Sequence, residues 1–343
     1  MEKLQIQKFG ITKDGSKPYL YKMKNDAGME VQVSDFGATV LDQDKNPVEV
    51  VLGYEDAAGY ENGTAAIGAI VGRNANRIGG ACVTINGIDY KLAENDGKNN
   101  LHSGPDVYQK RMWRVVENGD DHVTFLLHSP DGDQGYPGAL DMKVTYTLDE
   151  ENGLTIHYEA VPDQDTVINM TNHSYFNLNG HKSGSVLHHR MQLLSDAFTP
   201  ADAQSIPTGE VCSVDGTPMD FRSTKELGAE IDAAYEPLIL GNGYDHNWVL
   251  KNEGRFDKVA EVTGDESGIV MEVWTDRPGV QVYTANFLEN EAGRNGAVYQ
   301  KRDAVCLETQ NYPDAVHQKN FPEAICKKGE TYDTKTAYRF HIE

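Results

Sequence analysis

The sequence predicts an all-β fold, a large antiparallel β-sandwich with few short helices. Short segments of alternating apolar and polar residues follow one another along most of the 343-residue chain. Thirty-three glycines, together with many Asp and Asn residues, separate these segments and suit tight turns. Strands and helices do not alternate, which argues against a parallel nucleotide-binding sheet, and neither glycine-rich phosphate-binding motif occurs.

Pairs of alternating segments flank turn sequences at three places. Residues 83–85 and 88–90 flank Asn86-Gly87, the strongest two-residue hairpin signal. Residues 142–148 and 154–160 are joined by a polar turn. We also expect a hairpin where Asp276-Arg277-Pro278-Gly279 separates the alternating segments 269–274 and 280–287. Residues 123–127 and 338–342 are expected to add further strands.

Helical signals are few, and only one helix is predicted in detail. Residues 225–234 are expected to be helical, with Ser223 as the N-cap and Glu226 as its capping-box partner. No repeat of fixed period, low-complexity tract or linker interrupts the chain. Large all-β proteins often exceed the usual domain size, so residues 1–343 are expected to form a single domain.

The charge of the chain excludes two classes of partner. The sequence has 31 Lys and Arg residues against 53 Asp and Glu, a formal net charge of −22. This field repels phosphate backbones and anionic lipid, so no nucleic acid and no membrane surface is expected as a partner. No stretch approaches the roughly 20 apolar residues that span a bilayer, and the amino terminus lacks an export signal. The expected compartment is the cytoplasm, with four scattered, reduced cysteines: Cys82, Cys212, Cys306 and Cys326.

Three cationic or imidazole side chains stand in unusual settings. Arg73 and Arg77 lie in an apolar, glycine-rich stretch, where they either bind sugar hydroxyls or only offset the acidic surface. His102 lies on a turn-rich loop that presents one imidazole.

Further along the chain, polar segments add acid–base and binding candidates. His173 and Tyr175 lie in a run of amides, hydroxyls and aromatics, where the alternative is a buried histidine bonded to the backbone. Asp245 is expected in a turn, where it either grips a sugar or only forms the turn. Gln281 lies on a strand, and Glu308 is expected at a strand end. In a cleft this carboxyl would have a raised pKa, whereas outside one it would be an edge charge.

Sequence patterns of metal and serine hydrolase sites are missing. The sequence has no H-E-x-x-H, its histidines are not paired at metal-ligand spacing, and no G-x-S-x-G occurs. General acid–base chemistry by His and Glu, without a metal or other cofactor, is what remains.

The polar segments together resemble the aldose 1-epimerase (galactose mutarotase) family. The resemblance extends in family order from about residue 10 to the carboxyl end. The matching motifs are residues 72–73, 75–78, 100–102, 131–138, 169–178, 243–246, 279–283, 307–310, 313–315 and 320–322.

The resemblance implies a fold, an activity and a set of site residues. The implied fold is the β-supersandwich of galactose mutarotases. The implied activity is interconversion of the α and β anomers of free aldohexoses such as galactose and glucose. His173 would be the proton donor and Glu308 the proton acceptor. The residues implied to line the sugar site are Asn76, Arg77, His102, Tyr175, Asp245 and Gln281.

The chain departs from the family pattern at three places. Ser103 and Ala285 stand where glycine is usual, and Val316-His317 stands where Pro-Asn is usual. None of these replaces an acid–base residue, so they bear on sugar preference and loop shape. Galactose against glucose, and monomer against homodimer, remain open.

Anomer interconversion explains why these residue types are needed. One group takes the proton of the C1 hydroxyl while another protonates the ring oxygen, so each needs a pKa near the working pH. With Glu308 as base and His173 as acid, we expect carboxylates, Asp245 among them, to hold His173 protonated before turnover.

Two alternatives keep the same fold. A relative of glucose-6-phosphate 1-epimerase would need extra cations for the phosphate, which this acidic chain does not favour. A non-catalytic sugar-binding module would need neither His173 nor Glu308.

Overall fold

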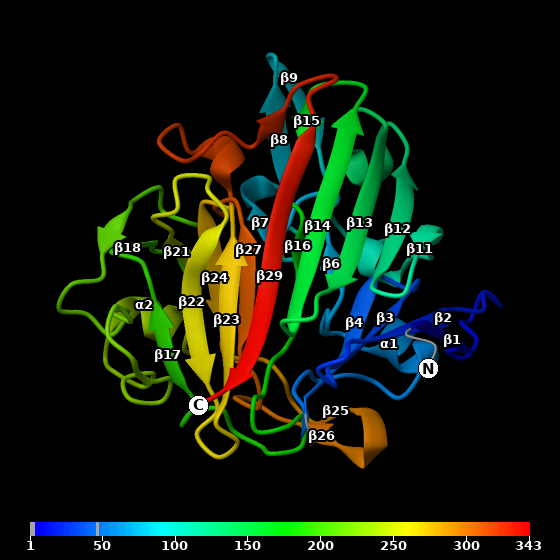
Figure 1. The fold of residues 1–343 in the computed structure, drawn as a ribbon. Helices are drawn as coiled ribbons and strands as arrows, with labels where there is room; N and C mark the ends of the chain where they lie inside the picture. Colours follow the sequence, from blue (N-terminus) through cyan, green and yellow to red (C-terminus); the bar gives the residue numbers. More distant parts are fainter. Residues whose placement is uncertain (1–3, 46–47) are drawn as a thin grey trace.

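A nine-stranded antiparallel sheet, the central sheet, runs through the molecule (Figure 1). The computed structural model describes residues 4–45 and 48–343. Alternate residues of the two longest neighbouring hairpin strands are buried, as their sequence pattern predicts. The strands, in spatial order, are β11 (Arg114–Asn118), β12 (His122–Ser129), β13 (Leu140–Leu148), β14 (Gly153–Pro162), β29 (Tyr332–Ile342), β23 (Ile269–Thr275), β22 (Asp257–Thr263), β17 (Arg190–Leu193) and β20 (Lys225–Glu226).

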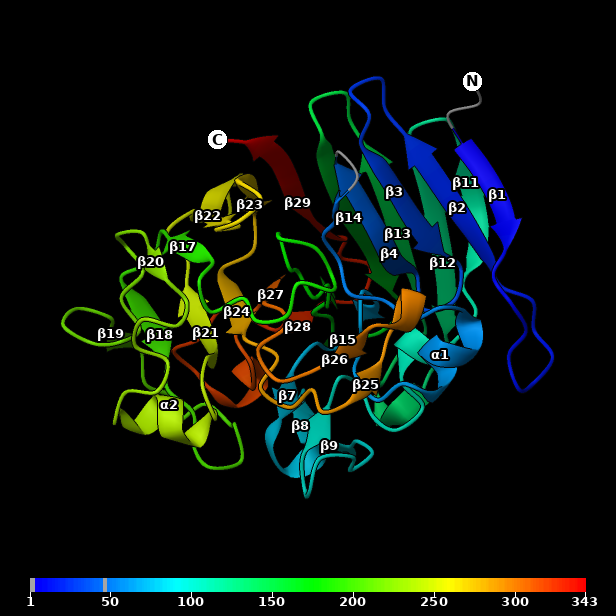
Figure 2. The same ribbon diagram turned by 90° about the horizontal axis from the view of Figure 1, so that it is seen from below.

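Two five-stranded sheets, here the amino-terminal sheet and the site sheet, pack side by side on one face of the central sheet (Figure 2). The amino-terminal sheet comprises β1 (Leu4–Lys8), β2 (Tyr19–Lys24), β3 (Glu30–Ser34), β4 (Thr39–Lys45) and β5 (Val48–Glu49). The site sheet has the order β19 (Cys212–Ser213), β18 (Ala197–Thr199), β21 (Asp245–Val249), β24 (Gly279–Tyr283) and β27 (Cys306–Gln310). Shared burial in one core joins the three sheets, so the predicted large β-sandwich is confirmed.

Contacts between the layers are specific. The rings of Tyr21 and Phe125 meet edge to face, with centroids 5.8 Å apart, between the amino-terminal and central sheets. The Tyr338 hydroxyl on β29 donates to the Leu307 carbonyl on β27 at 3.1 Å. The second contact fixes the site sheet against the middle of the central sheet.

Short elements complete the chain. The two α-helices of the described residues are α1 (Ala57–Asn62) and α2 (Glu236–Leu240). Single 3-10 turns occupy Gly79–Ala81, Tyr108–Lys110, Asp133–Gly135, Arg294–Gly296 and Ala315–His317. Paired short strands are β6 (Ile70–Val71) with β16 (Thr171–Asn172), β7 (Arg77–Ile78) with β10 (Asn100–Leu101), β8 (Cys82–Ile85) with β9 (Ile88–Lys91), β15 (Thr166–Val167) with β28 (Ile325–Cys326), and β25 (Glu291–Ala292) with β26 (Val298–Tyr299). Within residues 4–45 and 48–343, no helix has the length and apolar character that crossing a bilayer requires.

The predicted hairpin at Asn86-Gly87 is confirmed. Strands β8 and β9 pair directly across this turn, and both central residues have positive φ, 53° and 78°. Asn-Gly tolerates this geometry, which matches the twist of the flanking strands.

The hairpin predicted around residues 276–279 is wrong. Strand β23 pairs with β22 and β29 in the central sheet, whereas β24 pairs with β21 and β27 in the site sheet. The Asp276 carboxylate accepts the Thr334 hydroxyl and the Lys335 amide of β29, so the connection is bound to the central sheet. The turn residues therefore carry the chain from one layer to the other.

The helix predicted over residues 225–234 is also wrong. Lys225 and Glu226 form β20 beside β17. The Leu227 and Gly228 amides then donate to the carbonyls of His189 and Leu187, at 2.9 and 2.7 Å. Leu227 is fully buried in the core. Tertiary pairing and burial thus outweigh the local capping signal.

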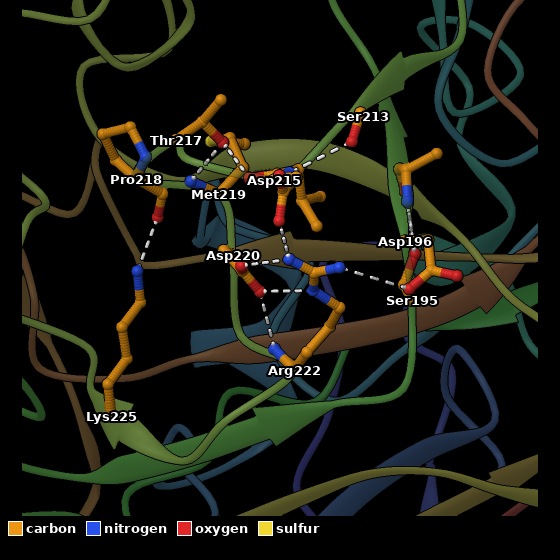
Figure 3. A network of polar contacts seen from close by, with 12 residues as sticks. Ser195, Asp196, Ser213, Asp215, Thr217, Pro218, Met219, Asp220, Arg222 and Lys225 are labelled. Carbon is orange, nitrogen blue, oxygen red and sulfur yellow. Dashed lines mark hydrogen bonds and ion pairs between the residues drawn. The ribbon is translucent and has the colours of Figure 1, made fainter.

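A charged loop packs beside the site sheet, and Arg222 makes several of its polar contacts (Figure 3). The Arg222 guanidinium bonds to both oxygens of Asp220 at 2.9 and 2.6 Å and also to Asp215. The same loop supplies the Met219 carbonyl, which accepts the Trp248 indole N–H at 3.0 Å. The loop is thereby tied to β21, the strand that begins with Asp245.

Candidate active site

A cavity of about 480 Å³ opens over one face of the site sheet. Successive side chains of a strand point to opposite faces, so Asp245, Tyr283 and Glu308 face the cavity while Val282 and Leu307 enter the core. The deeper lining residues are Asn76, Arg77, Leu101, His102, His173, Tyr175, Asp245, Tyr283 and Glu308. The outer lining residues are Thr64, Ala65, Ala66, Gln109, Phe287, Leu288, Glu289 and Glu291.

Glu308 is a buried carboxyl in the middle of β27, not at a strand end, and only 2% of it is exposed. Burial raises its pKa well above the usual value. The Asp245 carboxylate raises this pKa further, and Arg77 opposes the rise. Among the described residues, the Oε2 atom of Glu308 has no hydrogen-bond partner. A buried oxygen of this kind is suited to a ligand hydroxyl.

Main-chain contacts bring His173 to Glu308. The Thr171 hydroxyl donates to the Thr309 carbonyl at 2.8 Å. Beyond His173, the amide and carbonyl of Phe176 exchange two hydrogen bonds of 2.9 Å with Val305. The segment therefore lies beside β27, and His173 Nε2 is 3.5 Å from Glu308 Oε1.

The His173 imidazole is buried and stacks on Tyr175, with ring centroids 5.0 Å apart and an interplanar angle of 15°. Burial lowers the pKa of His173 to about 4. The expectation that neighbouring carboxylates hold His173 protonated is therefore wrong. Desolvation dominates, and the carboxyl nearest to it, Glu308, has a raised pKa and so carries less charge.

Strands β7 and β10 place three predicted residues at the cavity. Arg77 lies opposite Leu101 in this pair, and its Nε donates to Asp96 at 2.7 Å. Asn76 and His102 form a reciprocal pair, in which each backbone amide donates to the other residue at 3.1 Å. The side chains of Asn76, Arg77 and His102 all line the cavity.

Asp245 and Gln281 occupy neighbouring strands on the cavity face. Asp245 is the first residue of β21, so the turn expected there is wrong. Burial raises the pKa of Asp245 above its usual value. Gln281 is buried and is not one of the residues that line the cavity. Its Nε2 donates to Asp245 Oδ1 at 2.7 Å, so it orients a lining residue.

Arg73 does not reach the cavity, so a sugar-binding role for it is excluded. Its side chain is fully buried, and its two terminal nitrogens donate to five acceptors. These acceptors are the carbonyls of Pro137, Gly138 and Ser129 and the hydroxyls of Ser129 and Thr166. The Asp131–Gly138 motif region thus holds an internal arginine.

Tyr283, Leu101 and the outer lining residues were not assigned to the site from the sequence. The Tyr283 ring lies edge-on to His173, with centroids 6.1 Å apart. A period of two along residues 279–283 places Tyr283 on the same face as Gln281, which was a usable signal. Apart from Gln109 in a 3-10 turn and Glu291 in the two-residue strand β25, the outer residues lie on loops and turns, where no periodicity points to them.

Two departures from the family pattern lie in left-handed backbone. Ser103 has φ 67° and Ala285 has φ 50°. Glycine adopts this region without steric cost, which explains its usual presence there. The Ser103 hydroxyl accepts the Asn74 amide at 2.7 Å and so ties its loop to Asn74. The third departure, Val316-His317, lies in a 3-10 turn, where His317 bonds to Asp314 at 2.6 Å.

One group of described residues has the composition of a metal site. His102, His173 and Glu308 each offer a ligand atom, and these atoms lie within 4.8 Å of one another. Two imidazoles and a carboxylate are ligand types of Zn²⁺ and Fe²⁺. The Asn76 backbone amide donates to His102 Nδ1 at 3.1 Å, so a neutral His102 carries its hydrogen on Nε2. That nitrogen then has no lone pair for a metal, and the group is a poor metal site.

Comparisons with known proteins agree with this fold. The family model described as aldose 1-epimerase matches residues 19–339. The galactose mutarotase of Bos taurus is 42% identical over 322 residues, 92% of each chain. The aldose 1-epimerase of Escherichia coli is 37% identical over 341 residues, 97% of this chain and 98% of the relative.

Solved structures show the same architecture. The galactose 1-epimerase of Lactobacillus acidophilus superposes with a TM-score of 0.88 and 26% identity, covering 100% of this chain and 99% of the other. An aldose epimerase homologue from C. elegans gives a TM-score of 0.86 and 29% identity over 94% and 98% of the two chains. The sequence match spans nearly the whole chain and the fold agrees, so the protein belongs to the aldose 1-epimerase family.

Proposed function

We propose that the cavity interconverts the α and β anomers of free aldohexoses, such as galactose and glucose, by opening and closing the sugar ring. The observation that supports this most directly is the 3.5 Å separation of His173 Nε2 and Glu308 Oε1 within a lined cavity. Relatives named galactose mutarotase and aldose 1-epimerase support the same reaction.

Glu308 is the proposed base and His173 the proposed acid. Glu308 takes the proton of the C1 hydroxyl while His173 protonates the ring oxygen, and the ring C1–O bond breaks. The aldehyde then rotates about C1–C2, and ring closure returns both protons with the roles reversed. Atoms and charge balance without an external reactant, so the proposed reaction needs no metal or other cofactor.

The opposite pKa shifts of the two groups suit this exchange. Burial favours the uncharged forms, a protonated Glu308 and a neutral His173. Moving that one proton from Glu308 to His173 produces the charged forms that ring opening requires, and no proton comes from solvent. Sugar hydroxyls that donate to Glu308 stabilise its carboxylate and so promote this transfer.

The remaining lining residues have proposed binding roles. Arg77 donates to sugar oxygens and is oriented by Asp96. Asp245 accepts sugar hydroxyls and is oriented by Gln281. Asn76 and Tyr175 complete the wall around the ring. Four carboxyl groups and one arginine among the lining residues favour a neutral sugar over a phosphorylated one. The four free thiols are consistent with the proposed cytoplasmic site of action.

A mutarotation assay on the purified protein tests the proposal. Fresh α-galactose and α-glucose are followed by polarimetry, with chelator present and hexose 6-phosphates in parallel. We expect accelerated loss of optical rotation for the free sugars only, unaffected by chelator. A protein that binds these sugars by calorimetry without accelerating mutarotation is a binding module, and loss of activity on chelation contradicts a cofactor-free reaction.

A further inference from the structure

A second cavity, of about 570 Å³, lies beside the start of β22 and the end of β23. The segment that joins β21 to β22 and the charged loop of Arg222 contribute to its walls. Within the described part of the chain, the two cavities share no lining residue. Both volumes fall in the range of small-molecule sites, so the second cavity is large enough to hold a ligand of its own.

The charged side chains that line the second cavity are already paired within the protein. Lys258 contacts Glu261 and Glu272, at 2.9 Å each. The other pairs are Arg222 with Asp215 and Asp220 (Figure 3), Lys251 with Asp196, and Asp257 with Arg255. A charged ligand would have to displace one of these partners. A neutral ligand with hydroxyl groups can instead bond to the paired groups as they stand.

Asn252 provides an acceptor that the protein leaves unused. The residue is only 4% exposed, and its Nδ2 donates to the carbonyls of Thr275 and Arg277 at 2.7 and 3.0 Å. A carbonyl only accepts, so these two bonds fix which end of the amide is the nitrogen. Among the described residues, Asn252 Oδ1 has no hydrogen-bond partner. Because Asn252 lines the cavity, this oxygen is suited to a donor from a ligand.

Trp274 gives the same cavity a fixed aromatic surface. Its Nε1–H donates to Glu272 at 3.0 Å, and the Arg339 guanidinium lies 4.5 Å from the ring centroid. Both contacts hold the indole in place on the central sheet. A rigid ring of this kind can pack against an apolar ligand face with little loss of side-chain entropy.

We propose that the second cavity binds a neutral carbohydrate, with one face of a sugar ring on Trp274 and a hydroxyl donating to Asn252 Oδ1. A pyranose combines an apolar C–H face with hydroxyls that donate and accept, and it carries no charge. The site binds without reacting. Its carboxyl, Asp257, is paired with Arg255 at 3.1 Å, and no histidine of the described ranges lines it. This binding is separate from the proposed mutarotation.

Fluorine NMR on the whole protein, labelled with 5-fluorotryptophan, tests the proposal. The sequence has three tryptophans, of which Trp113 and Trp248 are 2% and 1% exposed. A soluble paramagnetic chelate therefore identifies the Trp274 resonance by broadening it most. The probes are methyl α-glucoside and methyl β-galactoside, which lack a free C1 hydroxyl and cannot open their rings. We expect them to shift the Trp274 resonance saturably at millimolar concentrations.

Matched variants use the same Trp274 signal. Asn252→Ala removes the unused acceptor and is expected to weaken binding about tenfold. Asn320→Ala, which also loses a side-chain bond to a carbonyl but lines neither cavity, should bind like wild type. In Glu308→Ala the first cavity is altered, and the shift of the Trp274 resonance should persist.

Three results would overturn the proposal. The first is a Trp274 resonance that neither glycoside moves at concentrations up to about 100 mM. The second is a shift caused by inorganic phosphate but not by the glycosides, which would mean that the cavity selects anions. The third is loss of the shift in Glu308→Ala, which would place the binding in the first cavity. None of these readings depends on mutarotation, so they are separate from any failure of the proposed function.

Discussion

Two buried polar regions of this molecule contrast in how their groups are satisfied. In the Arg73 anchor (Arg73, Ser129, Pro137, Gly138 and Thr166), the terminal nitrogens of one cation donate to five protein acceptors. In the proposed acid–base pair, His173 and Glu308, a buried carboxyl oxygen has no partner among the described residues. Both regions lie inside the protein, but the protein satisfies both terminal nitrogens of Arg73 and leaves only its Nε without a partner among the described residues.

This difference in hydrogen bonding distinguishes a buried polar group that stabilises the fold from one that is available to bind a ligand. A buried charge that is hydrogen-bonded mainly by the protein itself supports the fold, and removing its partners is costly. A buried carboxyl with a free oxygen costs stability until something binds there, and such groups concentrate at functional sites. Arg73 and Arg77 are four residues apart in sequence and belong to the two different regions.

The largest expected effect comes from breaking the acid–base pair. Replacing either member, as His173→Ala or Glu308→Ala, is expected to lower mutarotation by about 10³-fold or more, because positioned proton transfer is lost. Polarimetry on fresh α-glucose measures the rate, and circular dichroism with thermal unfolding checks the fold. Near-normal rates in a folded variant would end the assignment of that residue.

The next effect sharpens the contrast between the arginines. Arg73→Lys replaces a planar fork by one ammonium that cannot reach all five acceptors, and about 3–5 kcal/mol of unfolding free energy should be lost. Urea unfolding measures the loss. Arg77→Lys is the matched variant, expected to change kcat or KM while its urea midpoint stays close to wild type. Equal loss of stability in both variants would contradict the assignment of Arg73 to the fold and Arg77 to the cavity.

A smaller effect is expected on the stability of the folded protein, because the buried Glu308 carboxyl lacks a partner at Oε2 among the described residues. The raised pKa of Glu308 means that the folded protein keeps a proton which the unfolded chain releases above pH 4.5. Stability therefore falls as pH rises through this window, by at most about 1.4 kcal/mol per pH unit. Glu308→Gln removes this loss, so it should become progressively more stable than wild type above about pH 4.5.

The control for that prediction is His173, whose folded pKa of about 4 lies below the usual 6.5. Its contribution has the opposite sign, with stability rising between these values, and it is present in both proteins. The difference in urea midpoint between wild type and Glu308→Gln therefore isolates Glu308. A difference that does not depend on pH would show that the carboxyl is ionised in the folded protein.

The smallest effect is expected at Arg222, whose ion pairs lie at the surface (Figure 3). Arg222→Ala should leave mutarotation unchanged and lower Tm by no more than about 2 °C, because exposed ion pairs contribute little. Differential scanning calorimetry and the polarimetric rate measure both. A clear loss of activity would mean that the loop tied to β21 helps to position Asp245.

Sequence reasoning reached the sandwich but not all of its connections. The alternation of apolar and polar residues along 142–148 and 154–160 reflects only which face of each strand is buried. It therefore predicts these strands without knowledge of their partners. The layer change at residues 276–279 depends on contacts with β29, and the strand at Lys225–Glu226 depends on β17. Neither partner is visible from the local sequence.

The sequence predicted which residue types form the candidate site better than it predicted their positions and protonation states. The resemblance indicated seven of the residues that line the cavity, from Asn76 to Glu308. It could not separate Gln281 from the lining, because Gln281 shares the cavity face with Glu308 and differs only in a side-chain contact with Asp245 on the neighbouring strand. Likewise the deprotonated state of His173 follows from burial, which no motif encodes.

The hydrogen bonds that hold residues 171–176 beside β27 have a consequence for the range of substrates. The spacing of the two proposed proton-exchanging groups is set by the bond from the Thr171 hydroxyl to the Thr309 carbonyl and by the backbone bonds of Phe176, not by the side chains around the opening. The outer wall is instead built from loop positions such as Thr64 and Phe287. If the proposed site is correct, replacing those positions is expected to change which aldoses fit while the spacing of His173 and Glu308 stays constant.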